Sequence, residues 1–231
     1  IVSLGNVCKW LGEVAESLGV EVYPGFSAAE VLIDEDDKVY GVATGDMGVS
    51  KDGIAKDSWE SGMELHAKYT LFSEGARGSL SKFLIDNFEL SKESDHQKYA
   101  IGIKELWEVK EENHQEGLVE HSMGWPLSEG TGGGSFLYHF GQNLVSIGYV
   151  VHLNYTNPSV SPFAEFHQFN THPSIKKILE GGKRISYGAR AITAGGFQSV
   201  PKLFFPGGAL IGCSAGFLNY PKIKGTHNAM E

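Results

Sequence analysis

The glycine-rich segment at residues 203–230, LFFPGGALIGCSAGFLNYPKIKGTHNAM, constrains the fold of this chain more than any other stretch. Its apolar run ends at Gly212, small residues follow as a turn, and the residues around Lys224 to Thr226 predict the start of a helix. Small residues let a ligand approach the backbone closely, and the free N–H groups of a helix start carry partial positive charge. The segment is typical of a strand–turn–helix that receives an anionic group, and tight packing alone explains it equally well.

A second segment, TLFSEGARGSLSK at residues 70–82, also predicts a strand, a glycine-bounded turn and a helix start. The acid–glycine pair Glu74 and Gly75 directly follows the strand. The two segments lie on either side of a β-rich region. The chain therefore predicts an α/β fold (α+β in its details) with two similar junctions and a region inserted between them.

Composition and charge narrow the class of protein. The 231 residues are 41% hydrophobic and 20% charged, which is ordinary for a globular protein with one large or two small domains. A net charge of -9 argues against nucleic acid as a partner, because that affinity depends on basic side chains at phosphates. No apolar run reaches the ~18 residues that span a bilayer, so any membrane contact would be peripheral. Cys8 and Cys213 lack metal-ligand spacing, and each is interpreted as a small buried thiol.

The first part of the chain shows clear local patterns. Apolar residues at helical spacing predict a helix within residues 1–18, and residues 20–25 read as a short strand that stops at Pro24-Gly25. Two alternating runs around the acidic turn Asp34 to Asp37 predict a hairpin over residues 28–44. Residues 45–62 are rich in Gly, Asp, Ser and Lys and predict an exposed loop.

The character of the sequence changes at about Asp86, where a second domain is expected to begin. Runs at residues 101–109, 133–140 and 143–153 predict an antiparallel sheet, and residues 161–181 predict helix interrupted at Pro173. The charged stretch Glu105 to Glu120 is interpreted as a solvated strand face and turn rather than a binding patch. The histidines that stand out are interpreted as structural rather than catalytic: His139, His152 and His227.

Several longer runs resemble one family. GWPL, GGSFLYHF, NPSVSPFAEF, HPSIKKILEGGKRISYGARA, GGFQSVPKLFFPGG and IGCSAGFLNYPKIKGTHNAM are similar to the electron transfer flavoprotein-ubiquinone oxidoreductase family, and GVATGDMG and MELHAK fit it upstream. The likeness runs from about Gly5 to Met230. Cys213 stands where most related FAD enzymes carry an Asp, and a Cys at this position is usual in the family that the chain resembles. The resemblance implies a partial FAD-binding domain of the glutathione-reductase type with an inserted quinone-binding domain of β-sheet and helix.

The resemblance also implies domains and site residues. Residues 1–85 would be the middle of the FAD domain, 86–190 the ubiquinone-binding domain, and 191–231 the return to the FAD domain. The backbone of Gly133 and Gly134 would face the ubiquinone head, against the alternative that GTGGGS is a flexible hairpin turn; relatives often carry a Tyr where this chain has Gly132. The residues expected at the FAD are Glu74, Gly75, Arg77, Gly78, Thr193, Gly212, Cys213, Ser214, Gly216, Lys224, Gly225 and Thr226. Among them, Thr193 would tune the flavin potential by hydrogen bonding.

By the same resemblance, electrons would pass from reduced electron transfer flavoprotein through FAD and a 4Fe-4S cluster to ubiquinone, at the mitochondrial inner membrane or the bacterial cytoplasmic membrane. Such a cluster takes four Cys ligands and this chain has two, so its ligands are expected beyond Glu231. The glycine-rich pyrophosphate loop is likewise expected before Ile1, which makes the chain an internal fragment that would hold flavin weakly and lack quinone reductase activity. The alternatives are a geranylgeranyl reductase-like FAD enzyme and a non-catalytic module that docks on a membrane through Trp125, Phe136 and Leu137.

Overall fold

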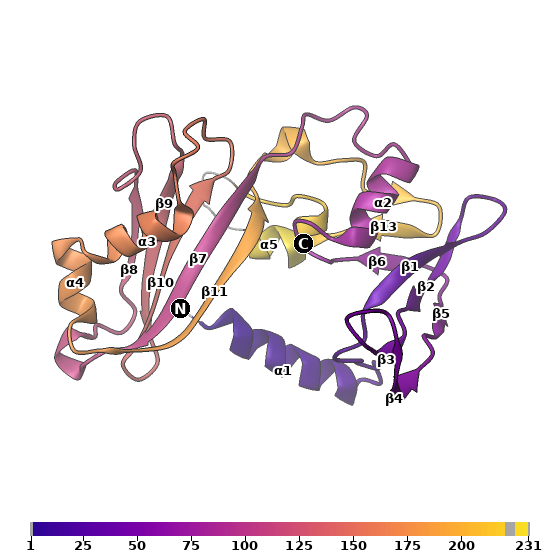
Figure 1. The fold of residues 1–231 in the computed structure, drawn as a ribbon, viewed down its shortest axis with the longest axis horizontal. Helices are drawn as coiled ribbons and strands as arrows, with labels where there is room; N and C mark the ends of the chain where they lie inside the picture. Colours follow the sequence, from indigo (N-terminus) through magenta and orange to yellow (C-terminus); the bar gives the residue numbers. More distant parts are fainter. Residues whose placement is uncertain (1, 220–224, 231) are drawn as a thin grey trace. The chain divides into compact units, whose positions relative to one another are not determined.

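The computed structural model describes residues 2–219 and 225–230, and the chain forms two compact units (Figure 1). The first unit comprises residues 1–22 and 98–192, and the second comprises residues 23–97 and 193–231. The described elements are mixed helices and strands in several sheets. The domain boundaries at residues 85 and 190 stay a prediction.

The first unit is built on a five-stranded sheet with the order β11-β7-β10-β9-β8. Its strands are β7 (Tyr99–Glu108), β8 (Val119–Met123), β9 (Gly133–Phe140), β10 (Leu144–His152) and β11 (Lys183–Thr193). β9 and β10 pair antiparallel from Phe140 opposite Leu144 to Gly133 opposite Val151. The turn between them contains Gly141 and Asn143, both with positive φ. The antiparallel sheet predicted from the alternating runs is therefore confirmed.

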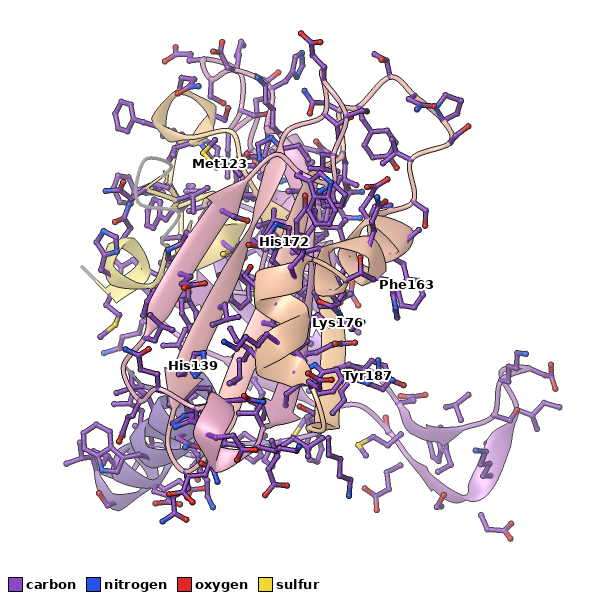
Figure 2. The ribbon with its side chains drawn as sticks, turned by 90° about the vertical axis from the view of Figure 1, so that its left-hand side faces the viewer. Met123, His139, Phe163, His172, Lys176 and Tyr187 are labelled. Carbon is purple, nitrogen blue, oxygen red and sulfur yellow. The ribbon has the colours of Figure 1, made fainter. Side chains whose placement is uncertain are left out.

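Two helices, α3 (Pro162–Asn170) and α4 (Pro173–Leu179), cover one face of this sheet (Figures 1 and 2). The Ser161 hydroxyl caps α3 by accepting a hydrogen bond from the N–H of Ala164. The odd-numbered side chains of β9 and β10 point toward the helices, since successive residues of a strand face opposite sides. They form the core with residues of both helices: Leu137, Val145, Ile147, Tyr149, Val151, Phe166, Phe169, Ile175 and Leu179. The predicted helix break at Pro173 is confirmed.

A buried carboxylate lies at the edge of this core. Glu105 of β7 is 3% exposed, and its oxygens accept hydrogen bonds from Arg184 (2.6 Å) and Trp107 (2.8 Å). Asn170 at the end of α3 donates a third bond of 3.3 Å. One acid therefore connects two strands and a helix. The interpretation of Glu105 as part of a solvated strand face is wrong, because three donors replace the water that the carboxylate loses.

We expect Arg184→Ala to lower the free energy of unfolding by about 2 kcal/mol, since the variant leaves a buried carboxylate without its cation. This loss of stability is smaller than for a fully buried ion pair, because the Arg184 side chain is 43% exposed and water can replace some of its hydrogen bonding to Glu105. Urea denaturation followed by circular dichroism measures the change. Arg190→Ala, an exposed arginine on the same strand, is the matched control; equal losses in the two variants would contradict the role of the ion pair.

The second unit contains three small sheets and one longer helix. β1 (Ala28–Ile33), β2 (Val39–Thr44) and β5 (Glu64–His66) form one sheet, and β3 (Met47–Val49) pairs with β4 (Ala55–Glu60). β12 (Phe204–Phe205), β13 (Gly208–Leu210) and β6 (Thr70–Phe72) form the third, and α2 (Ser79–Asn87) packs on β1. The core residues are Val31, Val39, Phe72, Leu80, Leu84, Leu90, Phe205, Leu210 and Ala215.

The structure confirms some local predictions in these regions and corrects others. The hairpin over residues 28–44 is β1–β2, and α1 (Leu4–Ser17) is the predicted first helix, although none of its residues is buried. The strand predicted at residues 20–25 is wrong, because this exposed segment pairs with no strand in the part of the chain that is described. The loop predicted at residues 45–62 is instead the β3–β4 hairpin, whose polar side chains stand in water on both faces of a two-stranded ribbon.

Candidate flavin and quinone sites

The candidate flavin site forms where β6 and β13 end. These strands pair in parallel, with Phe72 opposite Leu210, although they are separated by more than half of the chain. Because the carboxyl ends of parallel strands meet at one edge, the acid–glycine pair and the Gly212 turn lie next to each other. The Gly75 N–H donates to the Ser214 hydroxyl (3.1 Å), which in turn donates to the Gly75 carbonyl (3.2 Å). The two segments are thus directly bonded.

The Glu74 carboxylate faces the start of α2. It accepts hydrogen bonds from the N–H of Leu80 (3.3 Å) and from the N–H (2.6 Å) and hydroxyl (2.7 Å) of Ser81. A Cβ at Gly78 would overlap the Glu74 side chain, which explains the glycine there. The side chain of Arg77 is exposed. Glu74 therefore fixes the helix that follows the turn.

The turn after β13 is a short 3₁₀ helix, η3 (Gly212–Ser214). Gly212 and Gly216 both have positive φ, and the N–H of Gly216 donates to the Cys213 carbonyl (3.2 Å). Ser214 points into the protein, whereas Cys213 is exposed. Cys8 is exposed as well, so the interpretation of both cysteines as buried thiols is wrong. On a single tight turn, burial of one side chain turns its neighbour outward.

The remaining residues expected at the flavin lie around this turn or at the end of β11. α5 (Thr226–Met230) contacts η3, and a Cβ at Gly212 would lie 3.7 Å from that of Ala229. Gly225 immediately precedes α5, whereas Lys224 is outside the described residues. Thr193, the last residue of β11, is 4% exposed. The sequence did not single out Gln97, which contacts both Gly195 and Gly216. These partners are about 100 residues away, so no local pattern marks Gln97.

The glycine pair proposed for the quinone lies inside the sheet of the first unit. Gly133 and Gly134 begin β9, whereas residues 130–132 of the same GTGGGS run lie in the connection from β8 to β9, so the hairpin-turn alternative is right for the first half of the run only. A Cβ at Gly133 would overlap the Val150 carbonyl, and one at Gly134 would overlap the Ser122 carbonyl. Both neighbouring strands thus require glycine here. The Gly133 carbonyl accepts a long bond (3.3 Å) from the N–H of Gly124 and keeps a second lone pair.

The three residues proposed to dock on a membrane do not share one face. Leu137 is in the core under the helices, and Phe136 lies on the opposite side of β9, stacked on Tyr138 with centroids 5.0 Å apart. The rings of Trp125 and His172 contact each other with centroids 5.2 Å apart. His172 directly precedes α4 (Figure 2). That apolar face is therefore wrong as a single surface. No helix in residues 2–219 or 225–230 is long and apolar enough to cross a membrane.

The histidines differ in their surroundings. His139 is 1% exposed, and its Nδ1 accepts a hydrogen bond from the N–H of Gln115 (3.0 Å), so the proton lies on Nε2. Burial lowers the pKa of His139, and nearby His114 lowers it further. Burial, followed by the charge of Lys98, also lowers the pKa of His152. His227 on α5 is exposed. His139 thus favours its neutral form in the folded protein.

We expect acid to destabilise the first unit partly through His139. Its folded pKa lies below the ordinary 6.5, so this contribution is present above pH 6.5 and is lost as the pH falls from there toward the folded pKa. Urea unfolding between pH 7.5 and 5.5 should show a shallower decline for His139→Asn, which keeps an acceptor for Gln115, than for the wild type. His227→Asn is the control. An unchanged slope in His139→Asn would contradict the prediction; part of the slope should remain because of His152.

Comparison with solved structures identifies the class of fold. A geranylgeranyl bacteriochlorophyll reductase-like protein from Thermoplasma acidophilum aligns with 96% of this chain and 49% of its own at a TM-score of 0.70 and 17% identity. The flavin-dependent brominase Bmp2 aligns with 97% of this chain and 52% of its own at a TM-score of 0.65 and 16% identity. The chain therefore has the fold of FAD-dependent oxidoreductases and halogenases.

Sequence comparison identifies the family. A family described as "ETF-QO, ubiquinone-binding" matches residues 99–192. Electron transfer flavoprotein-ubiquinone oxidoreductases of Caenorhabditis elegans, Homo sapiens and Pseudomonas aeruginosa are 59%, 58% and 55% identical to this chain over its whole length. The matched regions cover 39%, 38% and 42% of those three proteins, respectively. The chain thus spans about two fifths of the length of these relatives. It belongs to the electron transfer flavoprotein-ubiquinone oxidoreductase family, as the resemblance predicted.

Proposed function

We propose that this chain supplies parts of the FAD site and the ubiquinone site of an oxidoreductase that passes electrons from reduced electron transfer flavoprotein, through FAD and a 4Fe-4S cluster, to ubiquinone. The observation that carries the proposal is the Ser214–Gly75 junction at the ends of two parallel strands, in a chain 55–59% identical to relatives of that name. In this proposal the first unit, with its five-stranded sheet, contains the quinone-binding domain, which is inserted into a glutathione-reductase-type FAD domain.

The residues at the junction fit a flavin nucleotide. Gly75 has φ +89, and no atom lies within 4 Å of the position of a Cβ, so its backbone is open to a close ligand. The exposed Cys213 lies on the turn that is bonded to Gly75. Gly75, the 212–216 turn, Gly225 and Thr226 would hold the cofactor. FAD, when bound, would supply the capacity to accept and pass on electrons.

The protein's own contribution is to position these groups. Ser214 fixes the distance between the two turns through two hydrogen bonds to Gly75, and Glu74 fixes α2 behind them. A turn held in this way presents its backbone to an anionic group without having to reorient. Thr193, buried at the end of β11, would place a hydroxyl that can donate to the flavin.

At the other site, the backbone of Gly133 and Gly134 would bind the ubiquinone head. Glycine offers no side chain between the strand and a flat ring, and the Gly133 carbonyl has a lone pair beyond its bond to Gly124. The 4Fe-4S cluster does not fit the residues of this chain, because such a cluster takes four Cys thiolates and the chain has two cysteines, Cys8 and Cys213. Membrane association is proposed as peripheral.

We expect this chain alone to bind FAD weakly and to lose it during gel filtration, because it holds no G-x-G-x-x-G loop for the pyrophosphate. The complete protein that contains it should retain FAD and reduce ubiquinone with electrons from reduced electron transfer flavoprotein. Absorbance at flavin wavelengths and a quinone reduction assay measure the two properties. Stoichiometric, tightly bound FAD on the chain alone would contradict the first expectation, and a complete protein without flavin would contradict the proposed function.

We expect Thr193→Ala in the flavin-loaded complete protein to lower the midpoint potential of the flavin. Loss of one hydrogen bond to the more electron-rich form costs about 1 kcal/mol, which corresponds to on the order of 20–40 mV for a two- or one-electron couple. Redox titration measures the shift. Thr193→Ser keeps the hydroxyl and is the matched control. An unchanged potential in Thr193→Ala would remove Thr193 from the site.

A further inference from the structure

A short strap, residues 95–97, ends the first segment of the second unit and is hydrogen-bonded to the segment that returns at Thr193. The N–H of Asp95 donates to the Gln198 carbonyl (2.9 Å), and the Ser199 hydroxyl donates to the His96 carbonyl (3.2 Å). The N–H of Gly195 donates to Oε1 of Gln97 (2.8 Å). Three successive residues therefore each bond the loop that follows Thr193. These three hydrogen bonds hold residues 195–199 against the strap.

The Gln97 side chain reaches further than this loop. Its Nε2 lies against Gly216, where it would be 2.5 Å from a Cβ, while its Oε1 would be 2.5 Å from a Cβ on Gly195. Real Cβ contacts are longer than 3 Å, so neither position accepts a side chain without displacing the amide. One amide group thus fills the space between the loop after Thr193 and the end of the Gly212–Gly216 turn.

The chemistry of the contacts indicates why an amide stands here. The Gly195 N–H is on a buried residue and needs an acceptor, which Oε1 provides. The flat, uncharged amide then lies against Gly216 without a second Cβ in the way. Gln97 is the last residue before the chain enters the first unit, and Thr193 is the first after it leaves. The bond to Gly195 therefore holds the outgoing and returning chain together.

We infer that Gln97 is a positioning residue for the flavin site: its amide fixes Thr193–Gly195 relative to the Gly212–Gly216 turn. The inference rests on the proposed FAD site and adds a residue to it. Gln97 acts through its neighbours rather than by touching the flavin. If the amide is removed, the turn bonded to Gly75 stays in place, whereas the loop after Thr193 loses the one of its three hydrogen bonds to the strap that lies nearest Thr193.

The test uses the flavin-loaded complete protein and five variants, one of which is the Thr193→Ala variant described above. Gln97→Leu keeps the volume and removes the acceptor, and Gln97→Glu keeps an acceptor for Gly195. Gln198→Leu is the matched control, because Gln198 is an exposed glutamine in the same loop. The double variant Gln97→Leu/Thr193→Ala measures coupling. The readouts are the FAD dissociation constant, the flavin midpoint potential and the melting temperature of each apoprotein.

We expect Gln97→Leu to weaken FAD about tenfold, the equivalent of one hydrogen bond, and to lower the midpoint potential. Gln97→Glu should restore most of the affinity, and Gln198→Leu should change neither property. The double variant should have the potential of Thr193→Ala alone, because residues that act through one group are not additive. If Gln97→Leu does not fold, the inference depends on Gln97→Glu, which must bind FAD within about threefold of the wild type.

Three outcomes would overturn the inference. One is wild-type affinity and potential in Gln97→Leu while Thr193→Ala shifts the potential, which leaves the FAD site standing and removes Gln97 from it. The second is a fully additive double variant, and the third is a Gln97→Glu that binds FAD no better than Gln97→Leu. Failure of the proposed function looks different: the wild-type complete protein would hold no flavin.

Discussion

The parallel pairing of β6 with β13 is the interaction on which the second unit depends. It closes a loop of about 140 residues, whose entropic cost grows only slowly with length, and apolar contacts repay that cost locally. Phe72 and Leu210, which lie opposite each other in the pair, are both buried, and Phe205 packs on Phe72 and is stacked on Phe88. Only with the strands aligned do Gly75 and Ser214 come within hydrogen-bond distance. The same contact that builds the core therefore builds the candidate flavin site.

Several glycines in and around the candidate sites have packing causes that precede any role in ligand binding. Neighbouring carbonyls occupy the Cβ positions of Gly133 and Gly134, and polar side chains occupy those of Gly78, Gly195 and Gly216. Gly75 differs, since nothing lies near its Cβ position. A glycine that no neighbour requires, at positive φ beside a bonded turn, is a stronger indication of close ligand approach than a glycine within a packed sheet. By this criterion the flavin junction is better supported than the quinone pair.

Sequence patterns predicted the elements whose signals are local. Alternation and turn residues were sufficient for β1–β2 and β9–β10, and Pro173 marked the break between α3 and α4. The failures have non-local causes. A strand at residues 20–25 needs a partner strand, and burial of Glu105 depends on Arg184, 79 residues away. The family resemblance predicted Thr193 and Ser214 as flavin residues, whereas Gln97 is recognised only from its contacts with Gly195 and Gly216 in the folded chain.

Two of the residues discussed at the flavin site, Gln97 and Thr193, lie where the chain passes between the two units. The chain leaves the second unit after Gln97 and returns at Thr193, so residues 98–192 form a continuous excursion. Such an inserted segment disturbs its host least when its two ends are held close together. The Gly195–Gln97 bond and the two bonds of the strap do this within the second unit. Because Gln97 bonds Gly195 and lies against Gly216, a substitution of Gln97 would release the loop after Thr193 from the Gly212–Gly216 turn.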